Sequence, residues 1–555
     1  MSRRYDVLIV GTGAAGGLLA WKLATAGAEV LSLEYGPPAP ASALMSLEPY
    51  WRAYQRLGAA EMQRCLHEPG PGSWKRAPYF LFKDGPEPYV TAGQAEWFWR
   101  RYRLVGGRSV YWNGVSPRMS PRDFQAGSED GFGPDWPLGY RDLEPYYDQA
   151  EELIGVCGPR DLDHPEWPRG KFLPPQPFRC GELILQRAVA GLRRPDLVYT
   201  HEPKAILTRP RPGRAACHYC GACAEGCAVG AKYDAAQVLL PQARASGHWT
   251  LRPGAAVAEV LADVATGRAR GVRYVDRATG EHHSAEARTV VLAASTIETA
   301  RILLNSKSRQ HPAGIGNGSG EVGRHLKDHI ECNISGFLPQ LYGRRCYPDE
   351  GYTYGAYVPR FNRSYQKKLG YIRGFQTQSG SGKGLDLQTP GVGAALKQAV
   401  TDRYEASVGA VSFGERLDSP ANYVDLDPRR VDAFGTPLAR IHAEPMGENE
   451  RLMFRDMRNQ LLEIFTAAGA EDITVSAAPP SPGTSEHESG TCRMGSDPGH
   501  SVTNQFGQSH EVGNLYICDL SLLPQQTEKS PTLTLLALTL RNGDYLLEQL
   551  RQGAA

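Results

Sequence analysis

The sequence predicts a mixed α/β fold (α+β overall) in two parts: a Rossmann-like domain with a parallel sheet and a second domain with an antiparallel sheet. The chain has 555 residues, far more than the ~100–200 of a typical single domain. Residues 5–34 alternate strand, glycine turn, helix and strand, which is typical of a parallel βαβ unit. Residues 351–358 and 406–413 show the alternation of strands that are covered on one face.

The opening unit has the pattern of a dinucleotide-binding site. Residues 5–10 form an apolar strand, residues 18–26 are a helical stretch rich in Ala and Leu, and residues 29–33 form a second apolar strand. The turn between strand and helix has the spacing G-x-G-x-x-G, with its glycines at Gly11, Gly13 and Gly16. This order of elements predicts that a dinucleotide lies at the end of the first strand.

Each residue of this pattern has a physical reason. Gly11 permits the tight turn, Gly13 lets the backbone approach a pyrophosphate, and Gly16 lets helix and strand pack closely. The helix N-terminus offers free N–H groups and a partial positive charge to the phosphates. Glu34 follows the second strand, where an acid accepts a hydrogen bond from a ribose hydroxyl. The motif alone suits FAD and NAD equally.

A second glycine-rich loop spans residues 105–114. It has little periodicity and many glycines. This combination predicts a loop whose backbone lies close to a large flat ligand, with an aromatic side chain nearby. Its candidate cofactor-binding residues are Gly106, Gly107, Trp112, Asn113 and Gly114.

Four of the eleven cysteines form a compact cluster in the loop 215–230. Their spacing is C-x2-C-x2-C-x3-C, at Cys217, Cys220, Cys223 and Cys227. This spacing favours an iron–sulfur cluster, and glycines inside the loop permit its sharp turns. Zinc is the rival ligand, but zinc sites normally separate their two cysteine pairs by a dozen or more residues. Four cysteines do not guarantee four ligands to one cluster.

Several further segments, taken together with those above, resemble the glucose–methanol–choline (GMC) oxidoreductases. They occur in the family's order along the chain, at residues 105–124, 136–152, 290–304, 320–329, 487–495, 514–519 and 530–538. The resemblance implies an FAD-binding domain built from residues 1–45, 90–330 and 485–555, with Asp519 among its cofactor-binding residues. It also implies a substrate-binding domain built from residues 46–89 and 331–484, with an antiparallel sheet over the flavin.

The same resemblance implies the catalytic residues. His487 opens the family's H-x-x-G-T-C motif, and histidine suits a base because its pKa lies near neutral pH. The family usually places a second His or Asn just before its Pro-Thr-Leu-Thr run, but this chain has Ser530 there. Ser530 either orients the substrate oxygen or is replaced by a residue of the substrate domain. His325, His329 and His510 are expected to be structural or to lie around the cofactor.

The predicted function is an FAD-dependent dehydrogenase that oxidises a CH–OH group of a sugar, glycoside or polyol. Hydride passes to flavin N5, and electrons leave one at a time through a [3Fe-4S] or [4Fe-4S] cluster to an external acceptor. Bacterial sugar dehydrogenases of the family carry a three-iron cluster on cysteines spaced like Cys217, Cys223 and Cys227, and Cys220 could complete a four-iron cluster. Two alternatives stay open. One is an oxidase or dehydrogenase of another alcohol, such as an antibiotic or cyclitol intermediate, with a structural cluster. The other is a redox-inactive or electron-transfer subunit.

Composition limits the partners. Sixty-one basic and sixty acidic residues leave no basic footprint for nucleic acid. The sequence contains no run of eighteen apolar residues, so no membrane-spanning helix is predicted. The first residues lack the pattern of a signal peptide, which predicts a cytoplasmic protein, or a periplasmic one if a signal-bearing small subunit carries it out. The resemblance adds a cytochrome or another electron acceptor as a partner.

Overall fold

The computed structural model describes residues 5–38, 89–221, 223, 226–344, 355–382 and 391–553. The expected excursion of the substrate domain at residues 46–89 lies outside these ranges except for its last residue. So do the first four residues of the strand predicted at 351–358. Within the described ranges no helix is long and apolar enough to cross a membrane.

A parallel sheet forms the core of the first part of the fold. β1 (Tyr5–Val10) pairs in parallel with β2 (Val30–Glu34) on one side and with β8 (His282–Leu292) on the other. β2 pairs in parallel with β5 (Trp249–Pro253), and β8 with β16 (Leu515–Ile517). These pairings confirm the predicted Rossmann-like sheet.

β8 takes part in two kinds of pairing. Its residues 287–292 pair with β1, whereas residues 282–286 pair antiparallel with β7 (Ala269–Asp276). β7 in turn pairs antiparallel with β6 (Ala255–Ala262), so an antiparallel ribbon extends the parallel sheet.

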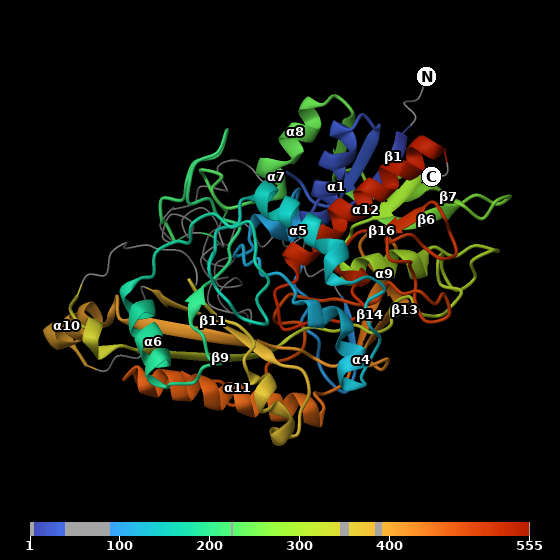
Figure 1. The fold of residues 1–555 in the computed structure, drawn as a ribbon. Helices are drawn as coiled ribbons and strands as arrows, with labels where there is room; N and C mark the ends of the chain where they lie inside the picture. The colour runs from blue at the N-terminus through green and yellow to red at the C-terminus, as the bar shows by residue number, and fades with distance from the viewer. Residues whose placement is uncertain are drawn as a thin grey trace.

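Helices cover both faces of this sheet because its strands are apolar on both faces. In β1, Val7 and Ile9 belong to the core under α1, whereas Leu8 and Val10 belong to the core that includes α9. The bounds of these helices are α1 Ala14–Thr25, α5 Tyr140–Ile154, α7 Ala235–Val238, α8 Leu240–Ala245, α9 Thr296–Asn305 and α12 Thr532–Gln552. Figure 1 shows α1 and α12 side by side over the sheet, with α5 next to α12.

A six-stranded antiparallel sheet forms the second part. Its strands are, in spatial order, β15 (Glu471–Val475), β9 (Ile330–Phe337), β12 (Ser407–Gly414), β11 (Phe375–Gly382), β10 (Ala356–Val358) and β4 (Thr200–His201). β12 confirms the strand predicted at residues 406–413. α11 (Glu448–Ala467) covers one face of the sheet, as Figure 1 shows.

The pleat of this sheet decides which side chains face α11. Ile330, Phe375 and Val408 belong to the core with α11. Successive side chains in a strand point to opposite faces. Glu331, Gln376 and Gln378 therefore point to the other face.

Three elements from residues 90–330, which were expected to belong to the FAD-binding domain, pair or pack with elements from residues 331–484. β4 and α6 (Cys180–Gly191) come from the segment assigned to the FAD domain, yet β4 pairs with β10 and α6 packs in the core of the antiparallel sheet. β3 (Val90–Gly93) pairs with β14 (Pro437–Ala443) in a small three-stranded sheet. The structure also contains the strand β13 (Tyr423–Val431) and the α-helices α4 (Ala126–Asp130) and α10 (Gly393–Arg403).

Candidate active site

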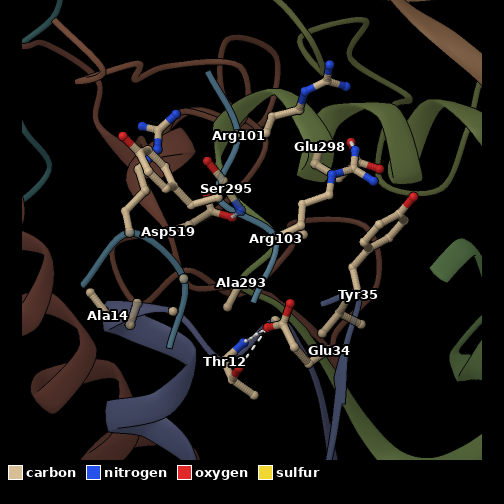
Figure 2. Close-up of a pocket in the computed structure, with 18 of the residues that line it drawn as sticks. Thr12, Ala14, Glu34, Tyr35, Arg101, Arg103, Ala293, Ser295, Glu298 and Asp519 are labelled. Carbon is tan, nitrogen blue, oxygen red and sulfur yellow. Dashed lines mark hydrogen bonds and ion pairs between the residues drawn. The ribbon is translucent and has the colours of Figure 1, made fainter. Parts of the chain in front are cut away.

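A cavity opens at the carboxyl ends of the parallel strands, where ligands of open α/β sheets bind. One end is lined by the glycine turn and by Glu34, and the lining also includes His487 and Asp519. Figure 2 shows Thr12 and Glu34 at the base of the cavity, with Ser295 and Asp519 on the side opposite Arg103.

The glycine turn leaves space for a ligand at one glycine and none at the other two. A Cβ at Gly11, whose φ is +95°, would lie 2.4 Å from the carbonyl oxygen of Ala293, and a Cβ at Gly16 would lie 2.2 Å from that of Gly11. A Cβ at Gly13 would meet nothing within 4 Å. The turn is therefore packed on its protein side and open where a pyrophosphate would approach, so the site fits a dinucleotide.

Glu34 is buried at the end of β2 and anchors the turn. Its Oε2 accepts hydrogen bonds from the N–H (2.9 Å) and the hydroxyl (2.7 Å) of Thr12, and its Oε1 accepts one from the N–H of Gly36 (3.0 Å). Burial raises the pKa of Glu34 above its ordinary value. These three bonds leave about one of the four lone-pair sites of this carboxylate for a ribose hydroxyl.

Two arginines in the segment 100–103 are candidate cofactor-binding residues that were not predicted from the sequence. Arg101 and Arg103 line the cavity. The Arg103 guanidinium lies 3.8 Å from the ring centroid of Tyr35 and 3.6 Å from the Glu298 carboxylate. The sequence does contain a signal for them, since Arg101 and Arg103 are two residues apart just before the second glycine loop. In an extended segment, side chains two residues apart point to the same side.

The second glycine loop contributes to the cavity only in part. Gly107 lines it, and a Cβ at Gly107 would lie 3.1 Å from the Cα of Gly13. The N–H of Gly106 donates to the hydroxyl of Thr12 at 3.3 Å. The predicted residues Trp112, Asn113 and Gly114 are not in the lining, so their contact with a cofactor stays a prediction.

Asp519 orders the opposite wall. One carboxylate oxygen accepts hydrogen bonds from the N–H of Ser295 (3.1 Å) and the hydroxyl of Thr299 (2.5 Å). The other accepts one from the N–H of Ser521 (2.9 Å). Ser295 has a φ of +79°, a strained conformation that these bonds stabilise at the start of α9.

His487 is held from three sides. Its backbone N–H donates to Asp328 Oδ1 at 3.0 Å, and its backbone carbonyl accepts a hydrogen bond from the side-chain amide of Gln526 at 2.9 Å. Its ring Nδ1 lies 2.8 Å from Nδ1 of His329. The ring of Phe413 packs beside it, with 5.7 Å between ring centroids.

Both imidazoles of this pair are kept neutral. Burial lowers the pKa of His487 well below its ordinary value, with His329 and Arg108 adding to the effect. Burial lowers the pKa of His329 to about 4. The expectation that His329 is structural or lies around the cofactor missed its contact with His487, which no local pattern signals.

Ser530 is buried and lies at hydrogen-bond distance from the substrate-domain sheet. The amide of Gln378 on β11 donates to its hydroxyl at 3.4 Å. The two preceding residues, Glu528 and Lys529, belong to a buried ion-pair network with Asp123 and Arg360. Such a network fixes the backbone that leads to Ser530.

The four cysteines of the loop 215–230 are all free thiols. Cys217, Cys223 and Cys227 pack together around Ile206 and Ala231. Backbone N–H groups donate to the sulfurs of Cys217 (from Tyr219) and Cys227 (from Lys232), each at 3.4 Å. Burial raises the pKa of Cys217 to about 11, and the other three cysteines add to that rise. Over the described ranges no three His, Cys, Asp or Glu side chains are arranged to hold a metal ion.

Lys232, which follows the cysteine loop, links that loop to the second glycine loop, because its backbone N–H donates to Cys227 Sγ and its ammonium contacts the glycine loop. The ammonium of Lys232 donates to the carbonyls of Val110 (2.7 Å) and Trp112 (3.0 Å). The indole N–H of Trp112 donates to the carbonyl of Tyr233 at 2.7 Å. The two loops therefore form one packed unit.

A Rossmann-like sheet whose glycine turn shares a cavity with a neutral histidine defines a dinucleotide-dependent oxidoreductase. Comparison with known proteins narrows this class. Two models of the GMC oxidoreductase family match residues 208–331 and 418–539. The chain belongs to this family of FAD-binding enzymes and is an oxidoreductase that acts on CH–OH groups.

The relatives that match almost the whole chain include two dehydrogenases. The 2-methyl-1,2-propanediol dehydrogenase of Mycolicibacterium austroafricanum is 32% identical over 98% of this chain and 95% of its own length. The fructose dehydrogenase large subunit of Gluconobacter japonicus is 28% identical over 99% of this chain and 98% of its own length. The crystal structure of pyridoxine 4-oxidase from Mesorbium loti has the same fold, with a TM-score of 0.62 at 17% identity over 98% of this chain and 99% of that one.

Proposed function

We propose that the protein is an FAD-dependent dehydrogenase that oxidises a CH–OH group of a sugar, glycoside or polyol to a carbonyl, with His487 as the base. The observation that supports this most strongly is that His487, a neutral imidazole, lines the same cavity as Gly11 and Gly13. The names of the relatives, a diol dehydrogenase and a fructose dehydrogenase subunit, support a polyhydroxylated substrate.

The chain's own residues supply the proton chemistry. His487 takes the hydroxyl proton of the substrate, and the carbon-bound hydrogen leaves as hydride while the C–O bond becomes a carbonyl. Bound FAD supplies the hydride acceptor at N5. Ser530, which has no titration near neutral pH, orients the substrate oxygen through one hydrogen bond. His487 then carries the base role alone.

The cofactor would lie along the cavity in one direction. Gly11 and Gly13 form the pyrophosphate end, Gly16 packs the turn behind them, and Glu34 accepts a hydrogen bond from a ribose hydroxyl. The residues proposed to lie about the rest of the cofactor are Gly106, Gly107, Trp112, Asn113, Gly114 and Asp519.

We also propose that Cys217, Cys220, Cys223 and Cys227 hold an iron–sulfur cluster. The spacing supports it, as do the two N–H groups that donate to sulfurs, because such bonds tune clusters of this kind. An iron–sulfur centre supplies one-electron chemistry when bound. Lys232 and Tyr233 link this loop to the second glycine loop, which supports a role in electron exit rather than a remote structural role. Such an exit requires an acceptor, and we propose a cytochrome or another one-electron acceptor, together with a signal-bearing small subunit, as partners.

Anaerobic titration with a panel of sugars, glycosides, polyols, amino-substituted alcohols and simple alcohols tests the proposed function. We expect the flavin absorbance of the purified holoenzyme to bleach with a polyhydroxylated member of the panel. Bleaching only with simple or amino-substituted alcohols would favour the alternative alcohol substrate, such as an antibiotic or cyclitol. No bleaching by any alcohol would favour a redox-inactive subunit.

The pH dependence of flavin reduction should reflect the low pKa of His487. A base must be unprotonated, so activity is lost as the pH falls through the pKa of the folded state. Burial places that pKa below the ordinary value of ~6.5. Stopped-flow measurements should therefore give a constant rate of flavin reduction from pH 8 to pH 6.5 and a decline only below it. A decline that begins above pH 6.5 would mean either that the base titrates higher than a buried imidazole or that Asp328 and Glu331, whose pKa burial raises to about 7, control the rate.

Replacement of Cys223 by serine should separate the two redox functions. We expect the variant to lose iron, acid-labile sulfide and the broad visible absorbance of a cluster, because serine is a poor ligand for iron. Bleaching of the flavin by substrate should persist, while reduction of a one-electron acceptor should be lost. Cys180→Ser is the matched control, since Cys180 is a free thiol outside the loop. An unsubstituted protein that contains no iron after anaerobic purification would disprove the cluster.

A further inference from the structure

Two histidine rings meet at the wall of the cavity, where His487 lines the cavity and His329 contacts His487 from behind. His329 lies just before β9, and His487 lies 158 residues further along the chain. Their Nδ1 atoms are 2.8 Å apart, and their ring planes are nearly perpendicular, at 83° with centroids 4.9 Å apart. This is the geometry of one hydrogen bond between the rings, not of a stacked pair.

The other nitrogen of His329 decides which ring donates. Its Nε2 is hydrogen-bonded to the backbone carbonyl oxygen of Thr527. A carbonyl only accepts, so Nε2 of His329 carries the hydrogen. A neutral imidazole carries one ring hydrogen, and therefore Nδ1 of His329 has a free lone pair and must accept.

The hydrogen between the rings must then come from His487. Its Nδ1 carries the hydrogen and donates to Nδ1 of His329, which leaves the lone pair on Nε2. We propose that His329 is a positioning residue that fixes the tautomer of His487, so that Nε2 is the atom that takes the substrate proton. This inference rests on the proposed role of His487 as the base.

The surroundings hold this chain of hydrogen bonds in place. The side-chain amide of Gln526 donates to the backbone carbonyl of His487. The backbone N–H of Lys529 donates to the hydroxyl of Thr527 at 3.2 Å. The residues on either side of the Thr527 carbonyl are therefore hydrogen-bonded. The ring of Phe413 packs against both imidazoles, at 5.8 Å from His329 and 5.7 Å from His487.

Charged groups near the pair are themselves paired or only partly ionised near neutral pH. The Arg108 guanidinium forms a bidentate ion pair with Glu488. Burial raises the pKa of both Asp328 and Glu331 to about 7. No carboxylate is hydrogen-bonded to either ring in the parts of the chain that the structure describes. The neutral acceptor on His329 thus takes the orienting role that a carboxylate has in a Ser-His-Asp triad.

Two variants at His329 separate positioning from simple packing. His329→Leu keeps the bulk but has no acceptor, so His487 loses its tautomer preference. We expect the rate constant of flavin reduction to fall about 10–100-fold, with little change in the substrate concentration at half-saturation, since a misplaced base costs rate rather than binding. His329→Asn places an amide oxygen near the position of Nδ1 and should restore most of the rate. His442→Gln, at a partly buried histidine stacked on Tyr423, is the control and should leave the rate unchanged.

Nitrogen-15 NMR of histidine-labelled holoenzyme tests the tautomers without any substrate. We expect His487 to be protonated on Nδ1 and His329 on Nε2, with the signals assigned by their loss in His487→Gln and His329→Leu. A hydrogen on Nε2 of His487, or an unaltered reduction rate in His329→Leu, would overturn the proposal. If no alcohol bleaches the unsubstituted enzyme, the proposed function fails, whereas the NMR result still decides the tautomer.

Discussion

Replacement of His487 by glutamine should slow the reduction of bound flavin by substrate by about 10³-fold, within the 10²–10⁴-fold range of general-base catalysis. Glutamine fills similar space and can still hydrogen-bond the substrate oxygen, but it cannot take a proton at neutral pH. Because His487 is buried against Phe413 and His329, a smaller side chain would also leave a void. Glutamine therefore isolates the loss of the base from the loss of packing.

Anaerobic stopped-flow measurement of flavin bleaching is the suitable assay, since it excludes electron exit. Flavin content and melting temperature should match those of the unsubstituted enzyme. His510→Gln is the matched control, because His510 contacts Ser501 and does not line the cavity. A rate constant within a few-fold of the original would assign the base to another residue.

Alanine at two neighbouring glycines of the opening turn should have opposite consequences. At Gly16 the added Cβ would lie 2.2 Å from the Gly11 carbonyl oxygen, a contact with backbone that cannot move without distorting the β1–α1 turn. Overpacking of this kind costs about 1–3 kcal/mol or more. We expect Gly16→Ala to lower the melting temperature of the protein both with and without FAD.

At Gly13 the protein itself has room for the Cβ, so Gly13→Ala should fold normally without cofactor. The methyl group would instead project into the space assigned to the pyrophosphate, and FAD affinity should fall strongly. Melting curves of the apoprotein and retention of flavin on gel filtration distinguish the two variants. Gly191→Ala, another glycine whose Cβ would meet nothing within 4 Å, is the control. Full retention of FAD by Gly13→Ala would contradict the pyrophosphate assignment.

Local patterns predicted the elements whose signals lie within a few residues. The strand, glycine turn, helix and strand of residues 5–34 appear as β1, α1 and β2, because apolar runs and turn glycines act over short distances. The strand expected at residues 406–413 appears as β12, at Ser407–Gly414. In contrast, β4 has only two residues and no periodicity of its own. Its place beside β10 depends on pairing across more than 150 residues, which no local pattern records.

The candidate site divides in the same way. His487 was predicted because its motif is contiguous, and Glu34 because it ends a recognisable strand. His329 ends the family-like segment at residues 320–329, but that segment does not signal its role, which depends on a contact with a ring 158 residues away. The network that joins Asp123, Arg360 and Lys529 likewise draws on three distant segments, so the sequence offered no signal for it.

By itself the sequence determined the Rossmann-like opening, the dinucleotide motif, the family resemblance and the cysteine spacing, since each is written in neighbouring residues. Three features depend on the tertiary structure: the glycine turn and His487 share one cavity, Lys232 links the cysteine loop to the second glycine loop, and a second histidine contacts the first. The physical reason is that burial and hydrogen-bond partners depend on which distant segments the fold brings together. Those contacts set the pKa and the tautomer of a histidine, and its identity alone does not.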